Sequence, residues 1–337
     1  MTTTTNGAAL EHEIGAGGRF HLRQLSGKVR VQGIDGATAR VRERNGKSLA
    51  EGFQIETGEG QLSLTAPDRV GLNMVFDIGR RSSFDLEVEV PRGAAVSIES
   101  ASAELQLADL TNKLRIRTAS GDLALDRIAG TLELDAVSGD ARIEAEGALD
   151  LRARTISGDL SVRAPRLGKA EIGTTSGDVR VDALLAGDGP YGIETVSGDV
   201  TIVGRMGLRI EARTVTGDLR SELPHRRDAG PGRKLLIVGD GAIPFTFRSV
   251  SGDLRVATPR DGLPAVVATG ESPAVAPEAP VPPVPPTAPA APVPPAAPTN
   301  PGAGGREVAR MDVLRALERG ELSVEAAMRR IAEIEEA

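Results

Sequence analysis

The sequence predicts an all-β protein, a single-stack β-solenoid of the parallel β-helix kind, followed by a small α-helical hairpin on a disordered proline- and alanine-rich linker. Three observations predict this fold class. A Ser-Gly-Asp triplet recurs at a nearly constant interval, alternating apolar residues flank each triplet, and aromatic residues make up only 2% of the 337 residues. Large rings usually fill a thick globular core, so their scarcity indicates a thin, layered core of aliphatic side chains.

The triplet occurs seven times, once with Thr in place of Ser, and a fixed period of this length is typical of repeat architectures. Its glycines are separated by 18, 19, 19, 21, 19 and 35 residues, and we interpret them as structural turns: Gly121, Gly139, Gly158, Gly177, Gly198, Gly217 and Gly252. Degenerate copies stand at Ser102-Ala103-Glu104 and at Ser26-Gly27-Lys28.

Apolar residues alternate with polar residues on both sides of each triplet. Leu114 and Ile116 precede the turn at Gly121, Leu123 and Leu125 follow it, and later copies repeat the pattern. A period of two indicates strands with one buried face. One repeat is therefore a strand, a Ser-Gly-Asp turn, a second strand and a second turn.

Two arrangements of this unit are open: a hairpin in an antiparallel sandwich or barrel, or one coil of a solenoid whose like strands stack in parallel. The near-constant repeat length favours the solenoid, because every coil must close at the same length to stay in register. Stacking would place equivalent residues about 4.8 Å apart.

The residue types of the turn suit a sharp corner. Glycine tolerates positive φ, and the oxygens of Ser and Asp can accept hydrogen bonds from turn amides. A Thr two residues before the Ser recurs at 118, 155, 174, 195 and 214, which predicts a stacked column of hydroxyl groups.

Along the chain, residues 1–9 are expected to be a disordered N-terminus and residues 10–260 the solenoid. Within it, 10–99 are irregular or capping coils and 100–257 the regular repeats, with Pro91-Arg92-Gly93 at the step between them. The 35-residue interval holds an insertion, a polar surface loop from Pro224 to Gly232 and then an extra strand from Leu235 to Val238. The last copy, ending near Val256, is expected to close the stack.

The C-terminal part changes composition. Residues 261–305 hold 14 of the 22 prolines and are predicted to be an extended linker. Residues 306–337 carry apolar stripes at helical spacing and are predicted to be a helical hairpin. Two short helices bury too little surface to fold alone, so Leu314, Leu317, Met328 and Ile331 are candidates for contact with the solenoid, a second copy or another protein.

Composition excludes several classes of function. The net charge of −7 disfavours nucleic-acid binding, and the absence of cysteine excludes disulfides and thiolate chemistry. No apolar stretch reaches the length of a membrane span and the N-terminus resembles no secretory signal. A cytoplasmic protein is expected, with peripheral association to the envelope left open. His225-Arg226-Arg227 is read as a solvated loop rather than a phosphate site.

No catalytic residue and no cofactor site is predicted, since the three histidines are scattered and no nucleophile, phosphate loop or zinc pattern is present. One column could hold a ligand: Asp122, Asp140, Asp159, Asp178, Asp199 and Asp218. It is interpreted either as a row of calcium sites or as carboxylates that bond their own turn amides and face water. The nine-residue pattern of calcium-binding β-rolls is absent, so no metal is predicted.

The motif Thr155-Ile156-Ser157-Gly158-Asp159 and its copies, with Val90-Pro91-Arg92-Gly93 ahead of them, resemble the putative-adhesin family of bacterial β-solenoid domains, a domain of unknown function. The resemblance covers about residues 18–257. The segment from Val313 to Ala327 is similar to the short helical module of LiaX-type envelope-stress proteins. This resemblance implies a scaffold or sensing role linked to the cell envelope, without known catalysis.

Together these observations predict a non-catalytic scaffold or protein-interaction module, with a role in envelope stress sensing or signalling. Two alternatives remain: a self-assembling cytoskeletal solenoid, and a carbohydrate-binding or adhesin-like protein. The expected partner is a protein, or a second copy bound through the hairpin, and not a nucleic acid.

Overall fold

The computed structural model describes residues 3–67, 83–230 and 233–259. They belong to the first of two units of the chain, Met1–Ser272. The predicted linker (261–305) and the predicted hairpin with Leu314, Leu317, Met328 and Ile331 lie outside the described residues and stay predictions.

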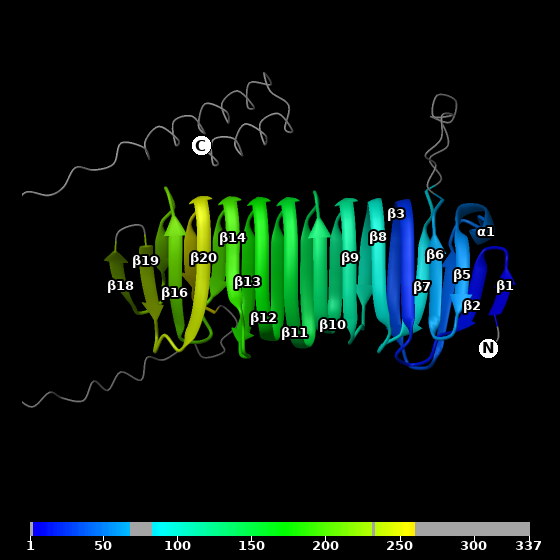
Figure 1. Ribbon diagram of the computed structural model, residues 1–337, viewed down its shortest axis with the longest axis horizontal. Helices are drawn as coiled ribbons and strands as arrows, with labels where there is room; N and C mark the ends of the chain where they lie inside the picture. Colours follow the sequence, from blue (N-terminus) through cyan, green and yellow to red (C-terminus); the bar gives the residue numbers. More distant parts are fainter. Residues whose placement is uncertain (1–2, 68–82, 231–232, 260–337) are drawn as a thin grey trace, which may run out of the picture. The chain divides into compact units, whose positions relative to one another are not determined.

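The described residues are almost entirely strands (Figure 1). The N-terminal strands are β1 (Thr3–Asn6), β2 (Ala9–Glu13), β3 (Arg19–Ile34), β4 (Thr38–Glu43), β5 (Gln54–Gly58), β6 (Gln61–Thr65) and β7 (Leu86–Pro91). The central strands are β8 (Ala95–Ala108), β9 (Lys113–Ser120), β10 (Leu123–Ala136), β11 (Ala141–Ser157), β12 (Leu160–Ser176), β13 (Val179–Leu185), β14 (Tyr191–Ser197) and β15 (Val200–Val203). The C-terminal strands are β16 (Leu208–Thr214), β17 (Leu219–Ser221), β18 (His225–Gly230), β19 (Arg233–Val238), β20 (Ile243–Ser251) and β21 (Leu254–Ala257).

Each coil has two faces that meet at the Ser-Gly-Asp corner. We call the strands before the corner the leading face and those after it the trailing face. Like strands of successive coils pair in parallel and in register: Leu132 lies beside Leu114 on one side and beside Leu151 on the other. This pairing confirms the solenoid and rules out antiparallel ribbons for the repeats. Long strands such as β10 and β11 bend at the second turn and contribute to both faces.

The order of strands follows from the pairings. The leading face runs β5-β6-β3-β8-β9-β10-β11-β12-β14-β20-β16-β19-β18. The trailing face runs β1-β2-β4-β7-β3-β8-β10-β11-β12-β13-β15-β21-β17.

The core fills the space between the faces with inward side chains in columns. One column on the leading face runs through Leu22, Ile98, Ile116 and Leu134 and ends with Phe247 and Ala212, and all of these are at most 3% exposed. Alternate residues point outward, as the period of two predicts. Because each inward residue rests on its equivalent in the next coil, a thin aliphatic core suffices.

The N-terminal region is more regular than the sequence suggested. Strand β3 is a complete coil, and its Ser26 and Gly27 lie beside Ser102 and Ala103 of β8, so both degenerate copies are true corners. Antiparallel strands β1, β2, β4 and β5 cap this end. The expected disorder of residues 1–9 is wrong from Thr3 onward, because β1 pairs with β2.

The last coil in the sequence does not close the stack. Strand β20 pairs with β14 on one side and with β16 on the other, and β21 lies between β15 and β17 in the same way. The coil of residues 243–257 is therefore inserted between two coils that precede it in the chain. The expectation that the copy near Val256 ends the stack was wrong, because sequence spacing does not say which strand edge a coil occupies.

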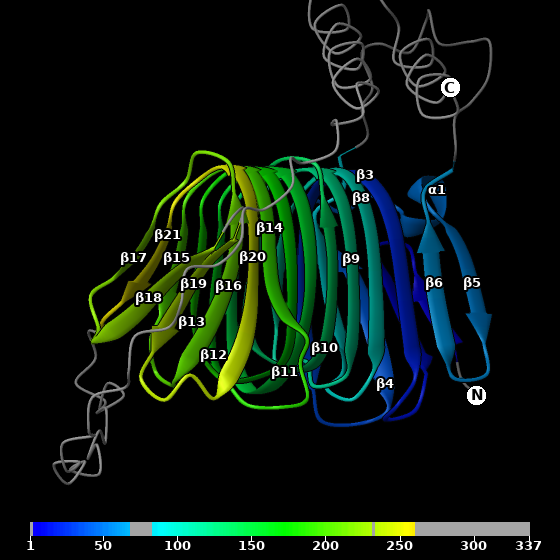
Figure 2. The ribbon, with the colours of Figure 1, turned by 60° about the vertical axis from the view of Figure 1, so that its left-hand side comes forward.

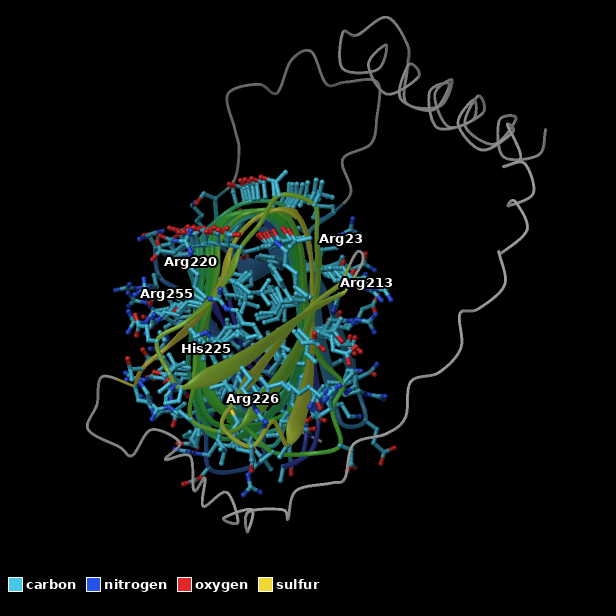
Figure 3. The ribbon with its side chains drawn as sticks, turned by 90° about the vertical axis from the view of Figure 1, so that its left-hand side faces the viewer. Arg23, Arg213, Arg220, His225, Arg226 and Arg255 are labelled. Carbon is cyan, nitrogen blue, oxygen red and sulfur yellow. The ribbon has the colours of Figure 1, made fainter. Side chains whose placement is uncertain are left out.

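The end of the stack is instead capped by the insertion in the long interval. The polar segment expected to be a loop, Pro224 to Gly232, contains strand β18, which pairs antiparallel with β19. Figures 2 and 3 show the two strands crossing the end of the stack obliquely, with His225 and Arg226 across the opening. Leu236 and Val238 of β19 are buried against the core, which explains why a polar strand forms here.

The inserted coil can be tested by disulfide formation, because the chain has no cysteine of its own. Glu194 and Arg213 are each in register with Arg248, from opposite sides. Stacked residues lie within the Cα separation that a disulfide spans. We expect oxidation to cross-link Glu194→Cys with Arg248→Cys, and Arg213→Cys with Arg248→Cys, as measured by peptide mass spectrometry.

The pair Glu194→Cys with Arg213→Cys is the matched control. These positions are separated by a whole coil, about 9.6 Å, which exceeds disulfide geometry. Efficient cross-linking of this pair would contradict the inserted position of β20.

Candidate functional site

The corner is the feature that recurs most closely along the stack. Nine corners lie in one line, in the spatial order Ser26, Ser102, Ser120, Ser138, Ser157, Ser176, Ser197, Ser251 and Thr216. Figure 3 looks along the stack, so that side chains at equivalent positions superimpose as rows. Arg220 and Arg255 lie on one side of the stack, and Arg23 and Arg213 on the other.

The glycine of each corner is held by contact with the next corner. A Cβ added to Gly158 would lie 2.2 Å from the carbonyl oxygen of Gly139, and one added to Gly217 would lie 1.9 Å from that of Gly252. Gly158 also has a φ of +122°, which side chains rarely adopt. Positive φ is shared by Gly121, Gly139, Gly177 and Gly198 but not by Gly217 or Gly252. Close packing of backbones, rather than φ alone, thus favours glycine in the row, where the degenerate corner alone has Ala103, beside Gly27.

The aspartates form a ladder of hydrogen bonds between coils. The backbone N–H of Asp159 donates to Oδ1 of Asp140 at 2.9 Å, and that of Asp178 donates to Oδ1 of Asp159 at 2.8 Å. The same bond joins every step of the series Asp122, Asp140, Asp159, Asp178, Asp199, Asp253 and Asp218. Each carboxylate thus accepts a hydrogen bond from the backbone amide of the neighbouring coil. The interpretation that each carboxylate bonds the amides of its own turn is therefore wrong.

This ladder uses Oδ1 of each aspartate and leaves Oδ2 available for other contacts. Asp140, Asp159 and Asp178 have no cationic partner among the described residues, whereas Arg220 lies 3.3 Å from Asp218 and 3.6 Å from Asp253. Within the described ranges, no three His, Asp or Glu side chains converge as a metal site would require. From Asp122 to Asp199 the row is therefore a line of negative charge that has no ion-pair partner in the described part of the chain.

The N-terminal end of the acidic row has a different composition. There Lys28 and Glu104 stand at the aspartate position, and their side chains form an ion pair of 2.7 Å. The N–H of Lys28 donates to Oδ1 of Asp85 at 3.0 Å, so the ladder bond itself recurs in the cap. The unpaired acidic row thus begins at Asp122.

The threonine column points inward at the corner. Thr118, Thr174 and Thr195 are buried, and the hydroxyl groups of the first two donate to the carbonyl oxygens of Ser120 and Ser176. The expected hydroxyl column is thus internal. Because the Thr faces inward, the next residue must face outward.

That next residue forms an exposed apolar row that the sequence analysis missed. Of the seven large apolar side chains exposed in the described part, six occupy this one position: Leu25, Val137, Ile156, Val196, Val250 and Val215, exposed by 47% to 77%. The seventh, Leu184, lies elsewhere. Smaller residues, Ala101, Ala119 and Thr175, complete the row. We call it the apolar row. The signal was available, since a Val or Ile beside an inward Thr has to be on the surface.

The two flanks of the apolar row differ in charge. On the leading face several adjacent outward residues pair with an opposite charge, so that Arg117 lies 3.5 Å from Asp135 and Arg248 lies 2.7 Å from Glu194, although Arg248 also stands in register with Arg213. Across the corner stands the uncompensated aspartate row. Where the apolar row narrows to Ala101 and Ala119, the surface has a shallow apolar depression of about 420 Å³.

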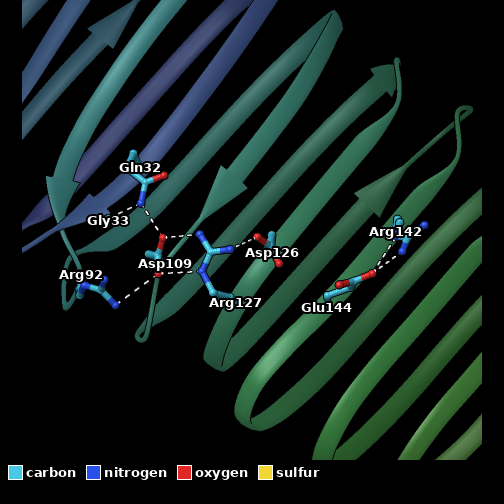
Figure 4. A network of polar contacts seen from close by, with 8 residues as sticks. All are labelled: Gln32, Gly33, Arg92, Asp109, Asp126, Arg127, Arg142 and Glu144. Atoms are coloured by element: carbon cyan, nitrogen blue, oxygen red, sulfur yellow. Dashed lines mark hydrogen bonds and ion pairs between the residues drawn. The ribbon is translucent and has the colours of Figure 1, made fainter. Parts of the chain in front are cut away.

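The opposite corner carries a separate polar network (Figure 4). Asp109, buried and with a φ of 59°, accepts hydrogen bonds from Arg127 at 2.6 and 3.1 Å and from Gln32 at 2.6 Å. Arg92 lies 3.3 Å away. The hydrogen bond from Arg127, then that from Gln32, lowers the pKa of Asp109 to about 2. These contacts fasten the second turns of the first coils and are structural.

The three histidines are not brought together. His12 lies against the carbonyl oxygen of Gly58 at 3.0 Å, and Nδ1 of His225 against that of Leu223 at 2.9 Å. The basic segment His225 to Arg227 is part of strand β18, at the edge of the leading face. The only helix among the described residues, α1 (Leu49–Gly52), has four residues, far short of a membrane crossing.

The glycine contact predicts a large effect of one methyl group. Gly158→Ala should destabilise the fold by about 3 kcal/mol, because it combines a disfavoured φ with a backbone collision. Gly173→Ala is the matched control, since a Cβ there would meet only Cγ of Arg154, at 4.0 Å. Thermal unfolding should show a Tm several degrees lower for the first variant and unchanged or higher for the second. Equal Tm values would contradict the role of the contact.

The network at Asp109 predicts a pH-dependent contribution to stability. Its folded-state pKa is lowered from 3.8 to about 2. The carboxylate therefore stabilises the fold fully above pH 4, and this contribution is lost as the pH falls toward 2. Asp109→Asn should lower the Tm by several degrees at pH 7, with the difference from wild type shrinking between pH 4 and 2.

Asp35→Asn is the control for this network. Asp35 also approaches Arg92, at 3.5 Å, but its side chain is 98% exposed, and exposed pairs contribute little. Its Tm should match the wild type at every pH. If the Tm of Asp109→Asn were lower than that of the wild type by the same amount at every pH, the shape of the side chain and not its charge would matter at this corner.

Comparison with solved structures finds matches among bacterial proteins. A structure described as a putative lipid binding protein from Parabacteroides distasonis ATCC 8503 shares 14% identity, with a TM-score of 0.45, over 75% of this chain and 98% of that one. A putative adhesin from Bacteroides fragilis NCTC 9343 shares 11%, with a TM-score of 0.42, over 75% and 98%. A putative cell adhesion protein from Clostridium sporogenes ATCC 15579 shares 11%, with a TM-score of 0.23, over 75% and 100%.

At this level of identity and overlap, the solved structures carry no argument about what the chain binds. Among curated proteins, none matches it. The family model named Toastrack DUF4097 matches residues 16–171 and 49–257, which together span the stacked coils and their corners. By this match over most of its length, the chain belongs to the Toastrack DUF4097 family.

Proposed function

We propose that this chain is a non-catalytic scaffold that binds another protein along its Ser-Gly-Asp corner. The apolar row is the observation that carries the proposal. Six of the seven large exposed apolar side chains in the described part share one repeat position. Scattered exposed apolar residues are ordinary, but a contiguous apolar surface marks an interaction site.

The fold itself does not require apolar residues in this row. Thr175 occupies the same position in a coil of ordinary geometry, between Ile156 and Val196, and the inward Thr and the glycine carry the corner. Val137, Ile156, Val196 and Val250 stay about half exposed, so a large part of their apolar surface gains no burial within the chain. A surface that costs solvation and is not needed for folding is best explained by a partner that covers it.

The envelope role rests on the resemblance of the segment from Val313 to Ala327 to the helical module of envelope-stress proteins. In this proposal the solenoid is the rigid binding surface and the tail, with Leu314, Leu317, Met328 and Ile331, makes a second contact on the cytoplasmic side of the envelope. A rigid array joined to a second binding module by a long linker gains affinity from the shared chain.

Self-assembly into filaments has less support. Antiparallel strands stand at both ends of the stack, and the terminal strand β18 carries Arg226 and Arg227. Charged edge strands oppose end-to-end pairing. Binding of carbohydrate also lacks a basis at the corner, since the row holds no aromatic side chain on which a sugar ring could rest.

A comparative capture experiment tests the proposal. Tagged full-length chain is incubated with a bacterial lysate in parallel with the triple variant Ile156→Thr, Val196→Thr, Val250→Thr, which places the natural residue of position 175 in three further coils. We expect quantitative mass spectrometry to find proteins retained by the wild type and lost by the variant.

Leu184→Thr is the matched control, because Leu184 is exposed to 36% but lies outside the row. It should retain the same proteins as the wild type. If circular dichroism shows that the triple variant is folded and the variant still captures the same proteins as the wild type, the corner is not the binding surface.

A further inference from the structure

We propose that the partner of the corner is an amphipathic basic helix, a segment with one line of apolar side chains and a flank of Lys or Arg. This inference rests on the proposed function and adds the chemistry of the partner. It is drawn from the pairing of two parallel rows on the same corner, one apolar and one acidic.

The apolar row sets the length and spacing of the partner. From Val137 to Val215 it crosses six stacked coils, a length of about 24 Å at 4.8 Å per step. An α-helix presents one apolar side chain per turn of 5.4 Å, close to the step of the row. One face of an extended strand repeats at about 6.6 Å and falls out of phase within two steps. A helix of about 16 residues matches the length of the row, and its repeat departs from the step of the row by about 0.6 Å, against about 1.8 Å for a strand.

The acidic row sets the charge of the partner. Asp140, Asp159 and Asp178 have no cationic partner among the described residues, and each uses Oδ1 for the ladder. The opposite flank carries ion pairs between neighbouring coils, such as Arg117 with Asp135 and Arg248 with Glu194. A helix lying on the apolar row would be attracted by Lys or Arg on the aspartate side and repelled by Asp or Glu there.

The same charges disfavour three other occupants. A second copy placed antiparallel would bring two aspartate rows together. The predicted hairpin of residues 306–337 carries six Arg and eight Asp or Glu, a net charge of −2. An anionic membrane surface would be repelled by the aspartates. Each of these occupants is a distinct outcome of the test below.

The test measures binding of two designed 18-residue helical peptides to the full-length chain by fluorescence anisotropy. One peptide has a Leu stripe flanked by Lys, and the other has the same stripe flanked by Glu. We expect the Lys peptide to bind at least tenfold more tightly than the Glu peptide. The triple variant Ile156→Thr, Val196→Thr, Val250→Thr should weaken its binding at least tenfold, and Leu184→Thr should not.

The double variant Asp159→Asn, Asp178→Asn separates the contribution of charge to peptide affinity from the contribution of the apolar row. The amide oxygen of Asn can still accept the ladder hydrogen bond, so the coils keep their contact while two charges are removed. We expect severalfold weaker binding of the Lys peptide and a smaller loss of affinity between 50 and 300 mM salt, conditions chosen to vary screening. A Tm close to that of the wild type confirms that the variant is folded.

Several results would overturn the inference. Equal binding of the two peptides would contradict the charge argument. If the triple variant still binds the Lys peptide as the wild type does, the peptide binds elsewhere on the acidic surface and not on the apolar row. Light scattering that shows a dimer lost in the triple variant assigns the row to a second copy. If the double variant Leu314→Ser, Ile331→Ser binds the Lys peptide more tightly than the wild type, the apolar row is occupied by the C-terminal tail. If the wild type floats with phosphatidylglycerol vesicles and the triple variant does not, the apolar row binds a membrane.

These failures are distinguishable from failure of the proposed function. If the lysate experiment finds row-dependent proteins but the Lys peptide does not bind, only the basic helical partner is wrong. If neither depends on the row, the interaction surface itself is wrong.

Discussion

One contact sets the geometry of this molecule: the backbone of each glycine corner rests on the backbone of the next, with no room for a Cβ. The carbonyl oxygen of Gly139 stands where a side chain of Gly158 would begin, and the same holds along the row. This approach keeps the coils at the strand spacing of about 4.8 Å. The registered core columns, the amide-to-carboxylate bonds and the line of outward apolar residues all depend on that common spacing.

The stacking of identical residues creates an electrostatic problem that the two sides of the corner solve differently. On the leading face, several neighbouring coils place Arg beside Asp or Glu, and these opposite charges form ion pairs between coils. At the corner the same residue, Asp, repeats, and its repulsion is offset by a backbone N–H that donates to each carboxylate. The ladder therefore lets a strongly acidic line persist on a folded surface, where unbonded carboxylates at this spacing would destabilise the stack.

Much of this architecture could be predicted from the sequence. The constant repeat and the alternation of Leu114, Ile116 and their equivalents were enough for the solenoid, and the degenerate corners at Ser26 and Ser102 were found by spacing. Strand β18 was missed because His225 to Gly230 shows no alternation, and its pairing depends on β19. The exposed Ile156 and Val196 were missed because β-branched residues in a strand suggest burial until the inward Thr is considered. The recurrence of Asp was seen, but its hydrogen bonds join coils that the sequence does not place side by side.

The inserted position of residues 243–257 has a consequence for how the chain is made. A ribosome delivers β16 about 17 residues after β14 but β20 only some 50 residues after it, and chain growth at about 5–20 residues per second makes this a delay of seconds. During that time the edge of β14 is exposed to β16, a strand with the same apolar alternation as its final neighbour. Completion of the stack therefore requires either that β16 does not pair with β14 before β20 is made, or that β20 later displaces β16 from β14. The C-terminal coils are therefore completed out of the order in which they are encoded.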